Sequence, residues 1–245
     1  MKIGFIGVGM MGEALLAGVL RGSVAPADVI VCERRADRAA ELKTTYGVTI
    51  VDSIADVAEA PTIFLVVKPG DIAGVVHELA PRLTPDHLLI SLAAGISIAA
   101  IEAESGAAGV IRVMPNTPAL VGVGMAAMSP GSHVSARQIA LAQELLAATG
   151  RVVEVPESQQ DAVTAVSGSG PAYIFLVIEA MTDAGVQLGL GRDIAAELAI
   201  QTVLGAATMA SETGEHPAVL RNRVTSPGGT TAAALAVLEE DGLRA

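Results

Sequence analysis

The sequence has few side chains that could bind a metal ion or form disulfides. Its 245 residues include one cysteine, Cys32, and four histidines that are scattered along the chain. A single cysteine excludes an intrachain disulfide framework and is typical of a protein from a reducing compartment. The cysteine and the histidines lack the spacing of zinc ligands, so we predict no metal site.

Positive charge and aromatic side chains are also scarce. The chain has 15 lysines and arginines against 26 aspartates and glutamates, and its net charge of -11 leaves no broad basic surface for nucleic acid or acidic lipid. Only 2% of the residues are aromatic, although 51% are hydrophobic. The core must therefore consist mainly of aliphatic side chains, which favours closely packed helices.

No segment has the pattern of an export signal or a membrane span. The start, MKIGFIGVGM, leads directly into a strand, without the basic and apolar segments of a secretory leader. The most apolar window, 172–181, reaches Glu179 and Asp183 before it attains the ~18 to 20 residues that a bilayer requires. We therefore expect a cytoplasmic protein without membrane contact, and a buried helix at 172–181.

The pattern of apolar residues divides the chain in two. Up to about residue 155, short apolar runs rich in β-branched residues alternate with helix-like stretches, which predicts a parallel sheet with crossover helices. After that, long Ala- and Leu-rich segments follow one another. We predict an α/β fold with a parallel-sheet domain, 1–156, followed by an all-helical domain, 157–245. The predicted strands lie at 2–7, 28–33, 62–69, 87–95 and 109–115.

One predicted helix, 192–212, is apolar around most of its circumference. Such a helix must be enclosed on several sides, and a small helical domain has few places to enclose it. We therefore predict that a second copy of the chain covers it. A central helix buried within one chain is the alternative.

The stretch GFIGVGMMGEALL, 4–16, contains the pattern G-x-G-x-x-G at Gly7, Gly9 and Gly12. It follows an apolar strand and precedes an amphipathic helix, which is the context of a dinucleotide-binding turn in a Rossmann-type domain. Gly7 permits the tight turn, Gly9 the approach of a pyrophosphate, and Gly12 close helix packing. The N-terminus of the helix supplies N–H groups to phosphate. A simple turn between strand and helix is the alternative.

Residues after the second predicted strand give conflicting signals about the cofactor. Glu33 lies about 20 residues beyond the glycines, where an acidic group binds the ribose of NAD. Arg34 and Arg35 follow directly and suit the 2′-phosphate of NADP. We predict NADPH, with NADH as the alternative, and for Arg35 a solvated position at the start of a helix is equally open. Residues 66–69 and 91–95, at the ends of two further strands, complete the predicted crevice, although each could be a plain turn.

A second small-residue string, SGSGPAY at 167–173, has no strand before it and so is not another phosphate loop. Pro171 suits the first turn of a helix, and Ser167 or Ser169 could cap it. The stretch VTSPGGTTAAAL, 224–235, again combines hydroxyls, glycines and a helix start. Convergent N–H groups in such a turn suit a small anion such as a carboxylate. An ordinary helix-capping turn is the alternative.

Six stretches, taken in order, resemble the pyrroline-5-carboxylate reductase family: FIGVGMMGEALL, VVKP, SLAAGISI, MPNTPAL, DAVTAVSGSGPAYIF and VTSPGGTTAAAL. The likeness runs from residue 1 to about residue 243, and SGSGPAY together with TSPGGTT is its most specific part. It implies a Rossmann domain followed by a helical domain that dimerises through interlocked helices, with dimers that can assemble into rings. It also implies that an imino acid, 1-pyrroline-5-carboxylate, is reduced to L-proline with NADPH or NADH.

The resemblance also implies roles for individual residues. Arg34 falls near the 2′-phosphate, Ser53 near the adenosine, and Glu157 at a position associated with the substrate amine. Thr231 is the catalytic candidate, as a partner of the ring nitrogen, and SGSGPAY braces the TSPGGTT loop. The other implied cofactor contacts are Ile6, Gly7, Val8, Gly9, Met10, Met11, Gly12, Val66, Val67, Lys68, Pro69, Leu92, Ala93, Ala94 and Gly95; the other implied substrate contacts are Ser226, Gly228, Gly229 and Thr230.

The chain stops at DGLRA, 241–245, where this family usually continues into one more amphipathic helix. This departure puts the stability of the dimer in question rather than the chemistry of the site. Two other functions remain open. A dehydrogenase of the β-hydroxyacid type would have a lysine at the start of its helical domain, where this chain has SGSGPAYIF. A non-catalytic dinucleotide-binding regulator would have no need of the TSPGGTT loop.

The predicted reaction asks little of the protein's own acids and bases. A protonated imine is already electrophilic, and the cofactor carries the hydride. We therefore predict a site without a catalytic histidine, cysteine or metal ion, in which the protein orients the reactants and excludes water.

Overall fold

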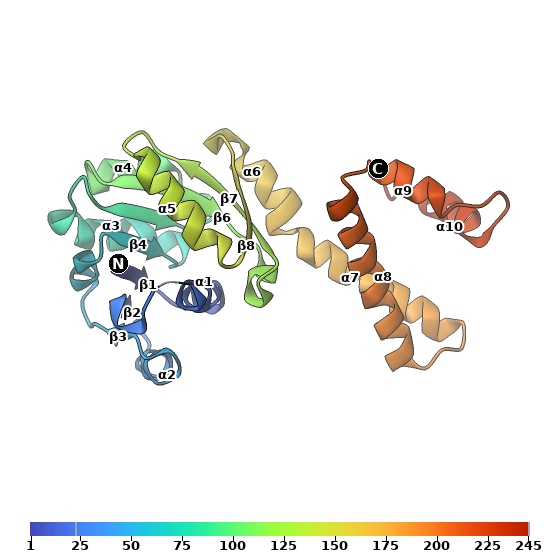
Figure 1. Ribbon diagram of the computed structural model, residues 1–245, viewed down its shortest axis with the longest axis horizontal. Coiled ribbons are helices and arrows are strands. Elements are labelled where there is room, and N and C mark those ends of the chain that lie inside the picture. Colours follow the sequence, from blue (N-terminus) through green and yellow to red (C-terminus); the bar gives the residue numbers. More distant parts are fainter. Residues whose placement is uncertain (23, 245) are drawn as a thin grey trace. The chain divides into compact units, whose positions relative to one another are not determined.

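The structure, a computed structural model, describes residues 1–22 and 24–244. They form two compact units, residues 1–172 and the chain from Tyr173 onward. The first unit contains an eight-stranded sheet, and the second consists of helices (Figure 1). The predicted fold class is confirmed. The predicted domain boundary after residue 156 stays a prediction.

The strands of the sheet follow the order β3-β2-β1-β4-β5-β6-β7-β8. The five predicted strands correspond to β1, β2, β4, β5 and β6, which are parallel neighbours. Every residue of these five strands is buried, because helices cover both faces of the sheet, and this explains why the runs lack a polar side. The strands are β1 (Ile3–Ile6), β2 (Val29–Cys32), β3 (Thr49–Ile50), β4 (Thr62–Leu65), β5 (Leu88–Ser91), β6 (Gly109–Met114), β7 (Gly124–Pro130) and β8 (Gly150–Glu154).

Three strands were missed by the sequence analysis, and one of them departs from the predicted parallel arrangement. β7 pairs antiparallel with β6, and β8 then pairs parallel with β7. The sequence of β7, GMAAMSP, contains no β-branched residue and therefore gives no strand signal. β3 is only two residues long.

Helices pack on both faces of the sheet (Figure 1). One core lies beneath α1, α2 and α5 and includes Leu15, Leu42 and Leu145; the other lies beneath α3 and α4 and includes Ile72 and Ile101. Both cores are built from aliphatic side chains, as the composition predicted. The helices are α1 (Met10–Arg21), α2 (Ala36–Tyr46), α3 (Ile72–Leu79), α4 (Ile98–Ser105), α5 (Ala136–Ala147) and α6 (Gln160–Val163).

The helical unit buries very little within one chain. Among its described residues only Thr182, Ala195 and Ala199 are buried. A Cβ added at Gly185 of α7 would lie 2.9 Å from the Cβ of Ala195 of α8, so the glycine allows these two helices to approach closely. The helices are α7 (Gly170–Gln187), α8 (Arg192–Thr213), α9 (Pro217–Arg223) and α10 (Thr230–Glu240).

The helix predicted to be buried at 172–181 is instead exposed in the single chain, where Phe175 is 62% and Leu176 65% exposed. α8 likewise exposes Leu198 and Leu204 by more than half. The alternative of a central helix buried within one chain is therefore wrong for α8. The physical reason is that the described helical unit of one chain has no further helices or strands that cover these faces of α7 and α8.

Two helical segments of the described chain, Glu157–Gln187 and Arg192–Thr213, are long and apolar enough to cross a membrane by length and composition. The prediction that 172–181 is too short for a bilayer is therefore wrong, because the helix continues well beyond that window. The helices of soluble proteins that are covered by other helices pass the same test, so the finding is weak support for a membrane protein.

Candidate active site

A cleft of about 550 Å³ opens at the carboxyl ends of β1, β2 and β4. The strand order reverses between β1 and β4, and ligands of open α/β sheets bind at this reversal. We call it the switch-point cleft. It is lined by Ile6, Gly7, Gly9, Cys32, Glu33, Arg34, Arg35, Ile54, Val66, Val67, Lys68, Gly70, Asp71, Gly74, Val75 and Glu78.

The glycine pattern forms the turn between β1 and α1. Gly7 has a φ of 77°, which favours glycine, and its N–H donates to the carbonyl of Cys32 (3.0 Å). A Cβ at Gly12 would lie 3.0 Å from the Gly7 carbonyl oxygen, so Gly12 lets the helix pack on the turn. Gly9 has open space at its Cβ position, and no side chain of the described residues caps α1. The turn therefore fits a phosphate group.

Charged side chains hold this turn on both sides of Val8. The N–H of Val8 donates to Glu33 Oε2 (2.9 Å), and its carbonyl accepts a hydrogen bond from Arg38 Nε (3.2 Å). Glu33 Oε1 accepts a hydrogen bond from the N–H of Arg35 (3.1 Å), and the Glu33 side chain is only 11% exposed. Both carboxylate oxygens of Glu33 thus serve the protein's own backbone. This argues against the hypothesis that Glu33 binds the ribose.

Arg38 is held in turn by a polar cluster next to α1. Its guanidinium pairs with Glu13 and with Glu41 (2.7 Å), and Tyr46 donates its hydroxyl to Glu13 (2.8 Å). Burial acts to raise the pKa of Glu13, but the hydrogen bonds from Arg38 and Tyr46 outweigh it and lower that pKa below its usual value. Glu13 is therefore ionised at neutral pH and keeps Arg38 against the turn.

The predicted 2′-phosphate residues lie where the switch-point cleft meets solvent. The side chain of Arg34 is 80% exposed and that of Arg35 is 63% exposed. Arg34 Nη2 lies 3.3 Å from Asp71 Oδ2, so the arginine already has a carboxylate partner. Asp71 comes from the connection between β4 and α3, two residues beyond the predicted contacts 66–69, and was not itself predicted.

Seven predicted cofactor residues line the switch-point cleft: Ile6, Gly7, Gly9, Arg34, Val66, Val67 and Lys68. The other ten lie outside its lining. Val8, Met10, Met11 and Gly12 belong to the glycine turn and the start of α1, and Pro69 follows β4. Ser53 accepts a hydrogen bond from the N–H of Ala55 (3.2 Å) and so caps a short helix. Leu92, Ala93, Ala94 and Gly95 follow β5, the next strand of the sheet.

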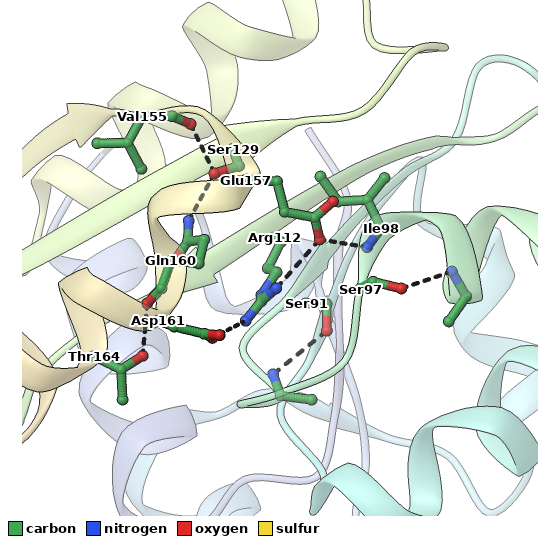
Figure 2. A network of polar contacts seen from close by, with 12 residues as sticks. Ser91, Ser97, Ile98, Arg112, Ser129, Val155, Glu157, Gln160, Asp161 and Thr164 are labelled. Atoms are coloured by element: carbon green, nitrogen blue, oxygen red, sulfur yellow. Dashed lines mark hydrogen bonds and ion pairs between the residues drawn. The ribbon is translucent and has the colours of Figure 1, made fainter.

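A polar network connects the loop after β5 to the start of the helix that enters the helical unit (Figure 2). Arg112 of β6 is 6% exposed, and its guanidinium lies 3.3 Å from Glu157 Oε1 and 3.8 Å from Asp161 Oδ1. Glu157 Oε1 also accepts a hydrogen bond from the N–H of Ile98 (2.7 Å), the first residue of α4. Glu157, predicted to bind the substrate amine, therefore holds α4 and the end of the loop 92–97.

Gln160 extends the network into the core (Figure 2). Its side chain is fully buried and donates to Ser129 Oγ (2.8 Å) and to the carbonyl of Ala127 (3.3 Å). Ser129 in turn donates to the carbonyl of Val155 (2.8 Å). These bonds fix the first turn of the helix to the sheet.

The string SGSGPAY continues this helix through a π-helical turn, Thr164–Gly168, into α7. Asn116, from the MPNTPAL stretch, donates to the carbonyl of Ser167 (3.2 Å) and accepts a hydrogen bond from the N–H of Met125 (2.8 Å). The helix is thus continuous, and the predicted cap by Ser167 or Ser169 is wrong, because the chain does not start a new helix here. Turns of this kind are frequent at functional sites.

The TSPGGTT loop forms the turn before α10 in the helical unit. Gly228 has a φ of 67°, and the N–H of Gly229 donates to the carbonyl of Ser226 (3.1 Å). A Cβ at Gly229 would meet Ser226 Oγ, so a larger residue there would require the Ser226 side chain to rotate. No side chain of the described residues caps α10, and its first hydrogen bond runs from Ala233 to Gly229. The N–H groups that this pattern leaves over at the start of the helix are those of Thr230, Thr231 and Ala232.

Two family models match the chain. The one described as "NADP oxidoreductase coenzyme F420-dependent" matches residues 2–95, and the one described as "Pyrroline-5-carboxylate reductase dimerisation" matches residues 157–245. The first match contains the glycine turn and the ends of β4 and β5. The second contains the TSPGGTT loop.

Curated relatives match over nearly the full length. The pyrroline-5-carboxylate reductase of Corynebacterium melassecola is 48% identical over 99% of this chain and 92% of its own. That of Synechocystis sp. is 46% identical over 99% of this chain and 91% of its own. The chain belongs to the pyrroline-5-carboxylate reductase family.

Solved structures of pyrroline-5-carboxylate reductases share its fold. That from Coxiella burnetii superposes with a TM-score of 0.93 at 41% identity, covering 99% of this chain and 92% of its own. The Plasmodium falciparum pyrroline carboxylate reductase, solved with NADP bound, gives 0.89 at 31% identity, covering 100% and 91%. The predicted enzyme class, an oxidoreductase with a nicotinamide dinucleotide cofactor, is therefore confirmed. These full-length matches favour a pyrroline-5-carboxylate reductase over both alternative functions.

Proposed function

We propose that this protein reduces 1-pyrroline-5-carboxylate to L-proline, the last step of proline synthesis. The observation that carries the proposal is the full-length agreement with reductases of that name, at 43–48% identity to those compared. The sheet unit adds a dinucleotide cleft at the switch point, and the helical unit adds a hydroxyl-rich turn with free N–H groups.

The reaction adds a hydride and needs little acid–base machinery. When bound, a reduced nicotinamide cofactor supplies the hydride. The hydride forms the new C–H bond at the imine carbon, and the electrons of the C=N π bond move to nitrogen. A protonated imine thereby becomes a neutral secondary amine, with no further proton required. The protein's task is to orient the reactants and to exclude water.

The cofactor would be held mainly by the switch-point cleft. The glycine turn would bind the pyrophosphate with its N–H groups, fixed by the hydrogen bonds of Glu33 and Arg38 to Val8. The small residues 93–95 would leave room for the nicotinamide ring. The exposed guanidinium of Arg34 suits a 2′-phosphate, which favours NADPH, with NADH as a second cofactor.

The substrate would be held by the TSPGGTT loop. The N–H groups of Thr230 and Thr231 suit the substrate carboxylate, and Ser226, Gly228 and Gly229 shape the turn around them. The Thr231 hydroxyl is the candidate partner for the ring nitrogen. Glu157 is better assigned to holding α4 than to the substrate amine, because Oε1 is already bonded to Ile98 and paired with Arg112.

The working form would be a homodimer, with rings of dimers as the larger assembly. The exposed apolar residues of α7 and α8, among them Phe175, Leu176 and Leu204, form faces that need cover. A second copy supplies that cover, which also accounts for the apolar composition of the two helices in a cytoplasmic protein without membrane contact.

A substrate panel tests the proposed activity directly. NADPH oxidation is followed with 1-pyrroline-5-carboxylate and, separately, with hydroxy and keto acids. We expect turnover with the cyclic imine alone. Turnover of a β-hydroxyacid in the reverse direction with NAD(P), or of no substrate in the panel, would contradict the proposal and favour one of the two alternative functions.

A further inference from the structure

The acidic residue that Rossmann enzymes use to read the ribose is already engaged in this chain. Glu33 accepts hydrogen bonds from the N–H groups of Val8 (2.9 Å) and Arg35 (3.1 Å). With 11% of its side chain exposed, it has little freedom to turn toward a ligand. Glu33 is therefore less available to a ribose hydroxyl than a carboxylate without backbone partners would be.

Asp71 offers that carboxylate from a different element. It lines the switch-point cleft, is 38% exposed, and lies 3.3 Å from the guanidinium of Arg34. Asp71 stands directly before α3, at a position where an aspartate side chain often caps the helix. In the described part of the chain, its side chain makes no capping hydrogen bond to α3. Its oxygens are therefore available to Arg34 and to a ligand at once.

The charges around the cleft give no overall preference for an extra phosphate. Three cations and three carboxylates line it, so their formal charges cancel. The choice between the cofactors then depends on which side chain stands next to the 2′ position. The cations are Arg34, Arg35 and Lys68, and the carboxylates are Glu33, Asp71 and Glu78.

We propose that Asp71, in place of Glu33, reads the adenine ribose, and that its ion pair with Arg34 limits the preference for NADPH. The inference rests on the proposed function, since it concerns the cofactor of that reaction. The 2′-hydroxyl of NADH donates to Asp71 while Asp71 stays paired with Arg34. The 2′-phosphate of NADPH takes Arg34 from Asp71, because exposed ion pairs are weak, and is then repelled by the remaining carboxylate.

Titration of each protein with NADPH and with NADH, followed by nucleotide fluorescence, tests the proposal without any turnover. In Asp71→Asn we expect Kd to fall about 3- to 10-fold for NADPH and to rise by about the same factor for NADH. In Glu33→Gln we expect both Kd values to rise together, because the Val8 turn loosens for either cofactor. In Arg34→Ala only the Kd of NADPH should rise, by about 10-fold.

Asp28→Asn is the matched control. Asp28 is 41% exposed, pairs with the terminal amine (3.2 Å), and lies at the start of β2, far along the strand from Glu33. Three results would each overturn the proposal. The Kd values of both nucleotides could change equally in Asp71→Asn, or Asp28→Asn could change the Kd values as much as Asp71→Asn does. The third is a weaker affinity for NADH alone in Glu33→Gln. If the wild type reduces the imine but Asp71→Asn leaves the ratio of the Kd values for NADPH and NADH unchanged, this inference alone is refuted. If Asp71→Asn changes that ratio but the wild type does not reduce the imine, only the proposed function is refuted.

Discussion

The sheet unit and the helical unit treat their apolar side chains in opposite ways. In residues 1–172, every residue of the five central strands is buried beneath helices. In the described chain from Tyr173 onward, the buried apolar residues are two alanines, Ala195 and Ala199, while large side chains such as Leu204 are more than half exposed. A sheet covered on both faces completes its own core, whereas this helical unit has little core within one chain.

The proposed work is divided in the same way. The groups that suit a cofactor lie in the sheet unit, where Glu33 and Arg38 hydrogen-bond the glycine turn at Val8. The groups that suit the substrate lie in the TSPGGTT loop, at the end of a helix that has no core of its own. The substrate loop should therefore depend on the dimer, and the cofactor cleft should not.

The largest effect should come from charging the exposed face of α8. Leu198→Glu combined with Leu204→Glu places two carboxylates in each copy of the proposed interface. Burial of a leucine contributes ~1.5 to 3 kcal/mol, so the Kd of the dimer should rise at least ~1000-fold. Sedimentation velocity would show a monomer whose sheet unit still binds NADPH.

The control for this prediction adds one negative charge to the sheet unit. Gln143→Glu lies on the exposed side of α5 and should leave the dimer intact. Ala199→Glu would not be informative, because Ala199 is 3% exposed within its own chain. If the wild type is already a folded monomer, the expectation that the helical unit is covered by a second copy is wrong.

Within the sheet unit, the largest effect should come from the pair of Arg112 and Glu157. Glu157→Gln leaves a buried guanidinium with only a distant, exposed partner, and should lower the free energy of unfolding by about 2 to 4 kcal/mol. Arg112→Met should cost less, because Glu157 is 32% exposed and can be hydrated. Urea denaturation followed by circular dichroism measures the free energy of unfolding of both variants. Equal losses of stability would mean that the burial of the guanidinium does not make Glu157→Gln the more damaging change.

The sequence was sufficient for the parts of the sheet unit that follow from apolar periodicity. The strands 28–33 and 109–115 were found because β-branched runs are buried on both faces, and β7 was missed because it has no such residues. Spacing identified Glu33 as a carboxylate at the right position, but spacing carries no information about the Val8 N–H that occupies it. Asp71 reaches the cleft only through the fold.

The same limit applies to the helical unit. Its apolar helices and the need for a partner could be predicted from composition, since 192–212 is apolar around most of its circumference. Which residues face inward could not be predicted, because Ala199 and Leu204 are both apolar residues of one helix, yet the first is buried and the second exposed within the chain.

The smallest effect concerns pH and the cluster beneath the glycine turn. Because the folded pKa of Glu13 lies below its usual value of 4.5, the ionised carboxylate stabilises the fold above that pH. This contribution, ~1 kcal/mol or less, is lost as the pH falls through the lowered folded pKa. Glu13→Gln should flatten the pH dependence of Tm in this acidic range. If the pH dependence of Tm is unchanged in Glu13→Gln, the loss of stability in acid comes from other carboxylates.

The central claim, that the sheet unit binds the cofactor and the helical unit the substrate, is tested most directly by Thr231→Ala. Thr225→Ala is the control, because its hydroxyl donates to the carbonyl of Arg221 (2.7 Å) in the same loop region. The account predicts that Thr231→Ala keeps the Kd of NADPH within about 2-fold while kcat/KM for the imine falls ~10- to 100-fold, the loss of a hydrogen bond to a charged group. A fall in kcat would indicate that the Thr231 hydroxyl contacts the ring nitrogen. A rise in KM would indicate that it contacts the carboxylate of the substrate. Wild-type values of both constants would contradict the account.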